Sequence, residues 1–482
     1  MIADSIPHPS LRLPVLGDAL KVSPDTRIQD TMGLARELGS IFEVRVRNAQ
    51  FVVVSDPDLV AELCDDKRFT KKVAGGVAEM RAVLADGLFT AHTDEPNWRI
   101  AHEVLLPAFS QAAMRSYHAT MVDVCNELLG SFDRGLGEPV EVLQNLTKYT
   151  LETVSRCGFG YKLGAFSDDS SDPAVAGLLN IVNRALHPPF SLPFLGRRQA
   201  KVRAEGNARD IAHLRGVVDG LIQRRVNGEN EGSDDLLESM LNSKDSAGQM
   251  LDHTNVRNQV MTFIFAGYVT TASALGVTLY YLSANPDVLK KARAEVDAMW
   301  PAGDGVPSFE QIAKLRYLRR VFDESLRLWP TAPAFTRQAR EDTVLGGKYP
   351  MRRGEAVTVH IPLLHRTAAW GDDVERFDPD RFLAENVKKR PAHVYKPFGT
   401  GERACIGRQF ANHEALVALA FILRRYELVG DPGYKLQISE SLSLKPKKFH
   451  LSLSLREHRG THHSGEFDDG AVASGCPHLE NS

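Results

Sequence analysis

One long apolar segment, from Thr254 to Pro286, narrows the folds open to this chain more than any other feature. Its large apolar residues recur at the spacing of an α-helix; they include Val256, Val260, Phe263, Ile264, Leu275, Leu279 and Leu282. Asp252 or Thr254 can cap the start of this helix, and Asn285 followed by Pro286 marks its end. At 1.5 Å per residue the helix would be roughly 45 Å long, enough to cross a whole domain. The sequence therefore predicts a fold built around one long central helix.

The rest of the sequence predicts further helices and only short strands. Helical periodicity dominates from about residue 57 to residue 300. Alternating patterns typical of strands occur at 41–55, 343–362 and 434–455. The first of them predicts a hairpin whose turn is Arg47 to Gln50. We therefore expect a mainly α fold with small β-sheets.

The two ends of the chain differ from its middle. Prolines punctuate residues 1–20, which we expect to form an irregular lead-in. Residues 21–455 are expected to form a single catalytic domain. Residues 456–482 contain almost no large apolar side chains and several Gly, Ser and His residues, which predicts a disordered tail.

Charge and composition exclude several classes of protein. The chain has 58 Lys and Arg residues against 61 Asp and Glu residues, a net charge of -3, so no overall positive field indicates nucleic acid binding. No run of eighteen apolar residues occurs, and the N-terminal segment lacks the apolar core of a signal peptide. We expect a cytoplasmic protein without a membrane anchor. The five cysteines lie far apart and form no CxxC pair, which suits neither a disulfide framework nor a zinc site.

Within the central segment, "AGYVTT" combines small residues with two threonines. Thr270 lies one helical turn after Ala266, on the same face. Small residues let a flat ligand lie against a helix, and a threonine in mid-helix can donate to the carbonyl oxygen four residues earlier. The same residues also suit a tight helix crossing with no ligand, so this segment alone leaves both interpretations open.

A second candidate site is "FGTGERACIGRQF", residues 398 to 410. We expect the glycines at 399, 401 and 407 to let the backbone turn sharply around Cys405, before a helix that starts at or just after the cysteine. The N-terminus of a helix favours a thiolate, and Arg403 can bind a carboxylate of a ligand. A lone thiolate beside a planar dianionic partner indicates haem.

The same loop also fits the dinucleotide fingerprint G-x-G-x-x-A, with Glu427 roughly twenty residues further on. Against this alternative, the preceding "HVYKPF" carries Lys396 and Pro397 where a buried parallel strand needs apolar residues. No further strand and helix units surround it. Haem therefore remains the favoured ligand.

At this point the chain resembles a known family. Phe398 to Gly407 matches every fixed position of the haem-binding loop of the cytochrome P450 family. "ESLR", Glu324 to Arg327, is similar to the family's Glu-x-x-Arg helix, and "FDPDRF", Phe377 to Phe382, resembles the segment whose arginine joins that pair. Over roughly residues 20–455 the chain looks like the haem domain of the fused, self-sufficient bacterial fatty-acid hydroxylases. The resemblance implies a cytochrome P450 fold, with the long central helix lying over haem b, iron protoporphyrin IX.

The resemblance also implies roles for individual residues. Cys405 would be the proximal ligand of the iron, with Phe398 near its sulfur and Gly399 in the turn of the loop. The residues implied to bind the haem propionates are Trp98, His102 and Arg403. The residues implied to shape the distal substrate pocket are Phe89, Ala266, Ala332 and Leu442. Thr270, with Thr271 beside it, would take part in proton delivery.

Two positions depart from the family pattern. The oxygen-activating helix of the family usually has an acid before its threonine, but here Val269 fills that place and Tyr268 precedes it. Either water with Tyr268 or Thr271 provides another proton relay, or the reaction needs less proton delivery. In the fatty-acid hydroxylases an Arg and a Tyr on the first hairpin hold the substrate carboxylate, and the alignment places Ala49 and Val53 there. Arg45 or Arg47 could compensate, provided that they face the channel.

The expected function is that of a haem-thiolate monooxygenase that inserts one oxygen atom into a largely apolar small molecule, with a fatty-acid-like molecule as one candidate. Its electrons would come from a separate flavin or iron-sulfur protein, unless the chain is part of a longer reductase fusion. Because of Val269, an enzyme that uses peroxide or nitric oxide, or that isomerises its substrate, is an alternative. A haem sensor without catalytic activity is a further alternative.

Overall fold

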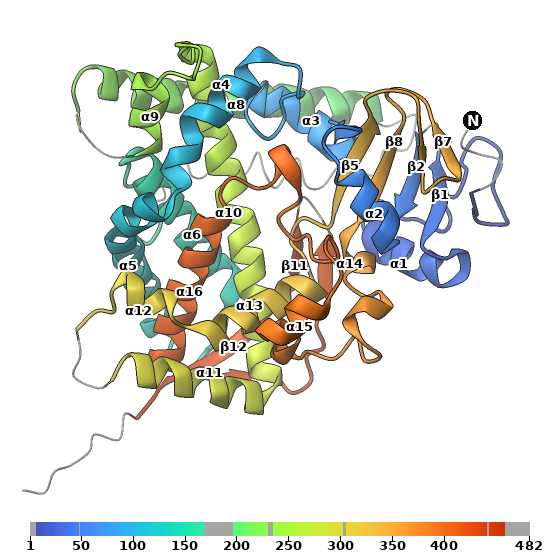
Figure 1. Ribbon diagram of the computed structural model, residues 1–482. Helices are drawn as coiled ribbons and strands as arrows, with labels where there is room; N and C mark the ends of the chain where they lie inside the picture. The colour runs from blue at the N-terminus through green and yellow to red at the C-terminus, as the bar shows by residue number, and fades with distance from the viewer. Residues whose placement is uncertain are drawn as a thin grey trace, which may run out of the picture.

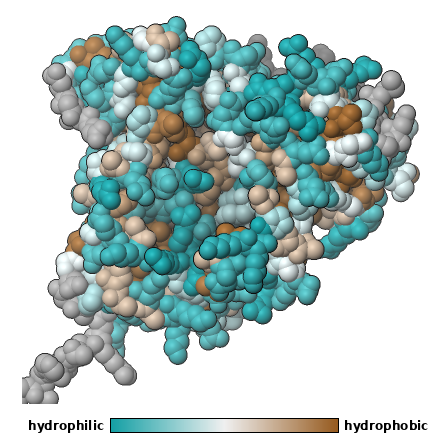
Figure 2. Space-filling view, in the orientation of Figure 1, coloured by the Kyte–Doolittle hydropathy of each residue, from teal (hydrophilic) through white to brown (hydrophobic). Residues whose placement is uncertain are grey.

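Helices form one side of the molecule and a small sheet forms the other (Figure 1). The computed structural model describes residues 6–47, 49–167, 196–229, 235–301, 305–440 and 443–457, with the backbone alone for 196–207. Most of the predicted tail and residues 1–5 of the predicted lead-in therefore lie outside the described residues. The face seen in Figure 2 is largely hydrophilic, with apolar side chains in separate patches. The mainly α fold with small sheets is confirmed.

The helical bounds agree with the predicted periodicity. The α-helices are α1 (Arg27–Leu38), α2 (Pro57–Leu63), α3 (Gly75–Leu84), α4 (Pro96–Leu105), α5 (Gln111–Asp133), α6 (Val142–Phe159), α8 (Gly196–Val226), α9 (Leu236–Asn242), α10 (His253–Ala284), α11 (Pro286–Met299), α12 (Phe309–Ala313), α13 (Arg316–Leu328), α14 (Ile361–Leu364), α15 (Ala384–Lys389) and α16 (Arg408–Arg425). Short 3₁₀ helices are η2 (Leu106–Phe109), η3 (Ala368–Trp370), η4 (Pro379–Phe382) and η5 (Gly401–Arg403).

The strands form four small sheets in the described part of the chain. They are β1 (Ile41–Val46), β2 (Ala49–Val54), β3 (Phe69–Lys71), β4 (Pro139–Glu141), β5 (Ala334–Ala339), β6 (Thr343–Leu345), β7 (Tyr349–Met351), β8 (Ala356–His360), β9 (Tyr426–Gly430), β10 (Ile438–Glu440), β11 (Leu444–Pro446) and β12 (His450–Leu455). The largest sheet has the order β1-β2-β8-β5-β3, in which β2 and β8 are parallel and the other pairs antiparallel.

Helix α10 is the predicted central helix, and it crosses the molecule in Figure 1. Asp252 caps its start by accepting a hydrogen bond from the backbone of Asn255 at 2.8 Å, and Pro286 follows its end. It packs along α6 and also touches α8, α13 and α16. The helix is long and apolar enough to span a membrane, but 72% of its most apolar window is buried inside the fold. Burial of this kind is typical of the core helix of a globular domain.

The first hairpin corrects one sequence prediction. Pairing runs from Ile41 with Val54 to Val46 with Ala49, so Ala49 and Gln50 belong to the strand and not to the turn. Arg47 has a φ of 54°, in the left-handed region, and starts a tighter turn than we predicted. Tight turns of this kind keep the two strands in register up to their ends.

A buried ion pair on α13 ties the helical part to the loops before Cys405. Arg327 donates to both carboxylate oxygens of Glu324, at 2.7 and 2.8 Å, and neither side chain is exposed. Nε of Arg381 in η4 lies 3.6 Å from the same carboxylate. The predicted association of "ESLR" with "FDPDRF" is therefore confirmed.

One histidine extends this network toward the cysteine loop. His365 bonds to the carbonyl oxygen of Arg327 at 3.0 Å through one ring nitrogen, and its other ring nitrogen accepts from the backbone of Lys396 at 2.9 Å. Its side chain is completely buried. The segment that leads to Cys405 is thus fixed to α13.

Candidate active site

The loop that carries Cys405 turns on two glycines. Gly399 and Gly401 have φ values of 73° and 64°, where side chains are unfavourable. A Cβ atom at Gly401 would lie 2.0 Å from a carboxylate oxygen of Asp66, which accepts a hydrogen bond from the backbone of Glu402. Gly407 differs from our expectation, because its φ is -80° and the nearest atom to a Cβ there is 3.8 Å away. The turn therefore requires glycine at 399 and 401 only.

Cys405 has accessible surface although many protein atoms surround it. This burial raises the pKa of its thiol above the ordinary value. A hydrogen bond from the backbone of Gly407 and the charge of Arg408 lower the pKa, but burial outweighs them. The position before α16 therefore does not by itself produce the expected thiolate. A bound metal ion would, because a coordinating thiol loses its proton.

The loop also fixes the cysteine from the N-terminal side. The backbone N–H of Cys405 donates to the carbonyl oxygen of Phe398 at 2.8 Å. The Phe398 side chain is half-buried and packs against the core cluster formed by α5, α6, α10 and α16. The structure thus brings Phe398, Gly399 and Cys405 together in one loop, as the sequence predicts.

One face of α10 carries exposed residues in an otherwise buried stretch. Ala266 is exposed, whereas Phe265 and Tyr268 beside it are buried. The hydroxyl of Thr270 donates to the carbonyl oxygen of Ala266 at 2.9 Å, as predicted. At roughly 100° per residue, Ala266, Val269 and Thr270 lie on one face of the helix. This face has room for a ligand at Ala266.

Gly267, next to Ala266, lies at the contact between α10 and α6. A Cβ atom there would lie 3.0 Å from the Val154 side chain on α6. The tight helix crossing that the sequence left open therefore exists, and Gly267 is the residue that permits it. Ala266 and Thr270 remain free of that crossing.

Arg403 lies at the centre of a group of residues from three parts of the chain. Its guanidinium lies over the Trp98 ring, 4.6 Å from the centroid, and Trp98 stacks on His102 at 5.3 Å. Arg403 also donates to the Thr93 hydroxyl and to the carbonyl oxygens of Leu88 and Ala91, at 2.8 to 3.2 Å. Three of its five N–H donors are thus occupied, and two remain for a ligand. The structure brings Arg403, Trp98 and His102 together.

Lys71 belongs to the same group, although the sequence analysis did not select it. Its ammonium donates to the carbonyl oxygen of Phe89 and lies 4.4 Å from the centroid of the Phe89 ring. Burial, and then the charge of Arg403, lower the pKa of Lys71 to about 7. Sequence offers no signal for this lysine, because its approach to Arg403 depends on the pairing of β3 with β5.

The positive charge of Arg403 lacks a free carboxylate nearby among the described residues. Burial and Arg403 lower the pKa of His102, and burial lowers the pKa of Arg403 itself to about 10. The nearby carboxylates of Glu402 and Glu95 are already paired with Arg340 and Arg81. Buried cations are stable only when paired. A ligand with two carboxylates would supply the missing charge, so these residues fit the propionates of haem.

The structure describes three of the four residues that were predicted to shape the substrate pocket. Phe89 is 38% exposed, and Ala332 and Ala266 are also exposed. Leu442 lies outside the described residues. Three of the four predicted positions therefore have surface free for contact with a substrate.

The register of the first hairpin shows on which face of the sheet the candidate substrate anchors lie. Ala49 is exposed, but Val53 is buried and packs against Phe42. Arg45 points to the opposite face of the sheet from these two residues, because it pairs with Gln50 in the register of β1 and β2. Arg45 therefore does not replace the missing substrate anchor. Arg47, at the turn of the hairpin, remains the candidate.

A buried carboxyl group behind α10 is a second feature that the sequence analysis missed. Glu414 on α16 is fully buried, and neither carboxylate oxygen has a hydrogen-bond partner of ordinary geometry. Burial raises the pKa of Glu414 well above its usual range, and the nearby hydroxyls of Thr271 and Thr153 lower it only in part. Burial therefore favours the protonated form of the Glu414 carboxyl group.

The alternative relay residues differ in their position on α10. Thr271 lies roughly 140° around the helix from Ala266, toward α6 and α16, and Tyr268 lies roughly 160° away in the other direction. The Tyr268 side chain is 2% exposed, its hydroxyl has no hydrogen-bond partner among the residues that the structure describes, and burial raises its pKa. Thr271 lies beside an acid, and Tyr268 does not.

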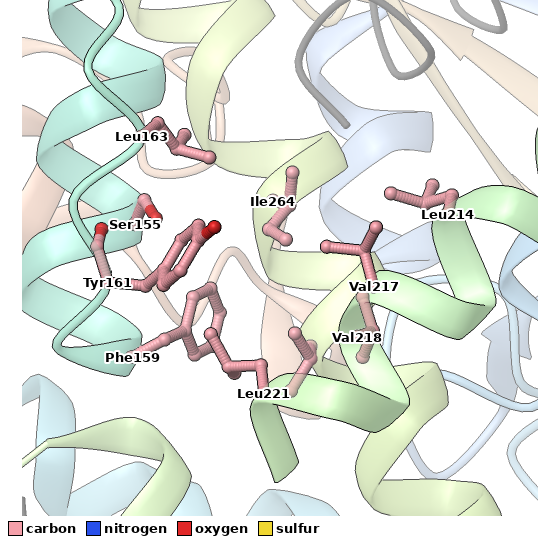
Figure 3. A pocket seen from close by; sticks show the side chains of 10 residues that line it. Ser155, Phe159, Tyr161, Leu163, Leu214, Val217, Val218, Leu221 and Ile264 are labelled. Atoms are coloured by element: carbon pink, nitrogen blue, oxygen red, sulfur yellow. Dashed lines mark hydrogen bonds between the residues drawn. The ribbon is translucent and has the colours of Figure 1, made fainter. Parts of the chain in front are cut away.

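A separate small cavity lies on the far side of α10 (Figure 3). It has a volume of about 40 Å³ and an almost wholly apolar lining. Its lining residues come from α6, the segment after α6, α8 and α10; they are Ser155, Phe159, Tyr161, Leu163, Leu214, Val217, Val218, Leu221, Val260 and Ile264. Ile264 lies roughly 160° around α10 from Ala266. Since cavities of about 150 Å³ hold a ligand such as benzene, this one is too small for a fatty acid.

A cysteine on a glycine-bent loop, a long helix with an exposed face, and a half-buried arginine stacked on Trp98 together fit the site of a haem-thiolate protein. The comparison with known proteins specifies the family. A family model described as "Cytochrome P450" matches residues 7–453. The chain belongs to the cytochrome P450 family.

Individual relatives support this assignment. A bifunctional cytochrome P450/NADPH–P450 reductase of Bacillus cereus is 41% identical over 462 residues, which cover 95% of this chain and 43% of the relative. A self-sufficient cytochrome P450 monooxygenase of Penicillium freii is 36% identical over 98% of this chain and 45% of its own length. The chain thus spans less than half the length of these relatives.

The solved structure of the cytochrome P450DA haem domain is similar throughout. It is 38% identical, with a TM-score of 0.88, and the match covers 94% of this chain and 97% of that domain. The likeness therefore extends over the whole haem domain.

Proposed function

We propose that this protein is a monooxygenase that uses dioxygen and inserts one oxygen atom into a largely apolar small molecule. The observation that carries the proposal is the exposed face of α10 at Ala266 and Thr270, in a fold whose cysteine loop and cation group suit haem b. Haem bound to the sulfur of Cys405 would supply the redox chemistry. The protein side chains would bind the substrate, exclude water and hold protons.

The substrate class follows from the side chains around the site. Phe89, Ala332 and Ala266 offer apolar surface, which favours an apolar chain or ring over a polar substrate. A fatty acid is the class that the resemblance to the self-sufficient bacterial hydroxylases implies, but the hairpin positions Ala49 and Val53 offer no charge or hydrogen bond to a carboxylate. Loss of such an anchor would weaken the binding of an anion by about 1 to 3 kcal/mol.

Protons would reach the site by a route that replaces the missing acid at position 269. In this route, the carboxyl group of Glu414 holds a proton and passes it to the Thr271 hydroxyl, which relays it through water to Thr270 on the ligand face. The support is the burial of Glu414 and its position beside Thr271. Val269 has no titratable group, so it cannot fulfil this function.

Electrons would come from a reductase, either a separate flavin or iron-sulfur protein or a further domain of a longer chain. The matched relatives are fusions of a P450 with a reductase, and this chain spans only 43% of the first of them. Both arrangements are compatible with the sequence.

The test compares oxidants on the haem-loaded protein. With a reductase and dioxygen, we expect oxygenated product from apolar substrates, and we expect peroxide to give much less. Product with peroxide or nitric oxide alone would favour the alternative that Val269 suggests. Absence of any product across all oxidants and a broad substrate panel would favour a haem sensor.

The substrate class needs a separate experiment. Optical titration of the ferric protein with a long-chain fatty acid and with its uncharged amide reports whether a ligand displaces water beside the iron. We expect the amide to bind at least as well as the acid, because the carboxylate anchor is absent. Much tighter binding of the acid would show that Arg47 or another cation has replaced that anchor.

A further inference from the structure

A short apolar projection lies beside the first hairpin. We call residues 11–20 the N-terminal tongue; they lie in the dark blue segment at the right edge of Figure 1. Four of its large apolar side chains are exposed: Leu11 (65%), Val15 (85%), Leu16 (42%) and Leu20 (76%). Exposed large apolar residues are normal when scattered singly, but four within ten residues form a patch.

The tongue is an ordered element of the fold. Leu13 and Gly17 exchange backbone hydrogen bonds of 3.0 and 2.9 Å, which closes a turn with Val15 inside it. Gly17 also pairs with Val46, and a Cβ atom at Gly17 would lie 2.3 Å from the carbonyl oxygen of Arg45. The backbone of Arg47 donates to the carbonyl oxygen of Leu16 at 3.1 Å. The tongue is thus attached to the β1–β2 hairpin at its turn.

Val15 occupies an unfavourable position. Its φ is 67°, in the left-handed region, where a β-branched residue is a rare outlier. Glycine or asparagine would fit this turn with less strain and less exposed apolar surface. Folding and solubility alone therefore do not explain a valine that is 85% exposed.

Three exposed cations lie beside the tongue, and the nearest exposed acid in the sequence is Asp25. Lys21, Arg45 and Arg47 are exposed, and none of them forms an ion pair among the residues that the structure describes. The acidic side chains beside the tongue, Asp18 and Glu43, are buried and lie within 3.4 Å of Arg12. The tongue therefore presents apolar side chains next to unpaired cations.

From this arrangement we infer that the tongue and the hairpin turn bind the surface of an anionic lipid bilayer. Apolar side chains that enter the acyl boundary and cations that meet anionic headgroups are the two components of interfacial binding. A second copy of this chain is a poorer partner, because a symmetric contact would bring the two sets of cations together. The expectation that the chain has no membrane anchor is compatible with such surface contact.

This binding would have a consequence for substrate supply. The tongue is attached to the hairpin that carries Ala49 and Val53, the positions implied to lie at the substrate mouth. An apolar substrate dissolved in the bilayer would then reach the protein without crossing water. This consequence rests on the proposed function, whereas lipid binding does not.

Co-sedimentation with vesicles tests the inference without any assay of turnover. We expect the haem-loaded protein to sediment with vesicles of phosphatidylcholine containing phosphatidylglycerol, and to bind vesicles of pure phosphatidylcholine about tenfold more weakly. The double variants Val15→Ser/Leu20→Ser and Arg45→Gln/Arg47→Gln should each weaken binding to the anionic vesicles by about tenfold or more. Their urea unfolding midpoints should stay within error of the parent, since all four side chains are exposed.

The matched control is Val429→Ser, which removes an apolar side chain that is 58% exposed elsewhere, on β9. It should leave vesicle binding unchanged. The inference is overturned if the parent protein does not sediment with anionic vesicles, or if the control loses as much binding as the tongue variants. A dimer in solution that the tongue variants dissociate would also overturn it, because the patch would then be an interface between copies.

Discussion

The hydroxyl of Thr270 donates to the carbonyl oxygen of Ala266 one turn earlier on α10, at 2.9 Å, and Ala266 itself is exposed. In this arrangement the hydroxyl hydrogen is held by the helix, and the neighbouring Val269 has no proton to offer. A buried acid behind the helix, Glu414, lies beside Thr271. These contacts are the basis of the proposed proton route.

The first prediction concerns Glu414. In Glu414→Gln, which keeps the shape but loses the titratable proton, we expect the amount of product per reductant consumed to fall by about tenfold. This is less than the effect of a general acid in direct contact with the reacting atoms, because Glu414 acts through Thr271 and water. Spectral shifts on substrate binding should be unchanged. Adding an acid at the missing position, in Val269→Glu, should restore much of the yield in the Glu414→Gln background.

Infrared spectroscopy tests the protonation state of Glu414 without turnover. The parent protein should show a carboxylic acid band that persists at neutral pH and disappears in Glu414→Gln. A merely structural carboxyl group would give the same band but no rescue by Val269→Glu. If Glu414→Gln turns over with unchanged yield, the proposed route is wrong.

The second prediction concerns the two types of glycine in the cysteine loop. Gly401→Ala should lower both thermal stability and the haem content of the purified protein, because its φ is 64° and a Cβ atom would overlap Asp66. The left-handed backbone alone costs about 1 to 2 kcal/mol. Gly407→Ala is the matched control and should be tolerated. Equal effects of the two changes would contradict the geometry of this turn.

A third prediction concerns the buried ion pair on α13. Glu324→Gln leaves the Arg327 guanidinium buried without its counter-charge, so we expect a loss of about 3 to 5 kcal/mol in the free energy of unfolding. In contrast, Arg115→Gln breaks an ion pair with Glu310 in which both side chains are more than half exposed. It should cost at most about 1 kcal/mol. Urea titrations of the parent and the two variants measure these free energies of unfolding. Similar losses for both variants would show that the Glu324–Arg327 pair contributes no more than an exposed ion pair.

The fourth prediction is a dependence of stability on pH that arises from His365. Burial lowers the pKa of His365 from 6.5 to about 3, so the unfolded chain takes up a proton at a higher pH than the folded protein does. The contribution of His365 to the free energy of unfolding is therefore complete above pH 6.5. It is lost as the pH falls toward 3, by about 1.4 kcal/mol per pH unit.

The control is His365→Gln, whose amide oxygen can still accept from the backbone of Lys396. Between pH 6.5 and 4.5, the parent should lose roughly 2 kcal/mol more than this variant. All other titratable groups are shared by the two proteins. Parallel stability curves for the two proteins would show that His365 does not stay neutral in the fold.

The sequence could predict the features that depend on local pattern. The central helix is bounded by the Asp252 cap and Pro286, and both signals lie within the segment itself. The cysteine loop is marked by Gly399 and Gly401, since only glycine adopts their backbone conformation easily. The length of the hairpin turn was wrong by two residues, because Ala49 and Gln50 have no side-chain preference that separates strand from turn.

The features that escaped prediction depend on contacts between distant segments. Lys71 meets Arg403 only because β3 pairs with β5, and Glu414 meets Thr271 only where α16 passes α6 and α10. In the sequence, Glu414 lies in an ordinary helical run, and nothing there shows that its carboxyl group is buried beside Thr271. A buried lysine and a buried acid are signals of function only after the fold is known.

Iron K-edge X-ray absorption of the haem-loaded protein tests the central claim most directly. The account predicts one sulfur atom in the first coordination shell of the iron in the parent protein, and its loss in Cys405→Ser. Cys64→Ser should retain the sulfur, because Cys64 follows α2 and packs against the cluster beside the first sheet. A parent protein without iron-bound sulfur, or a Cys405→Ser variant that keeps it, would contradict the assignment of Cys405 as the ligand.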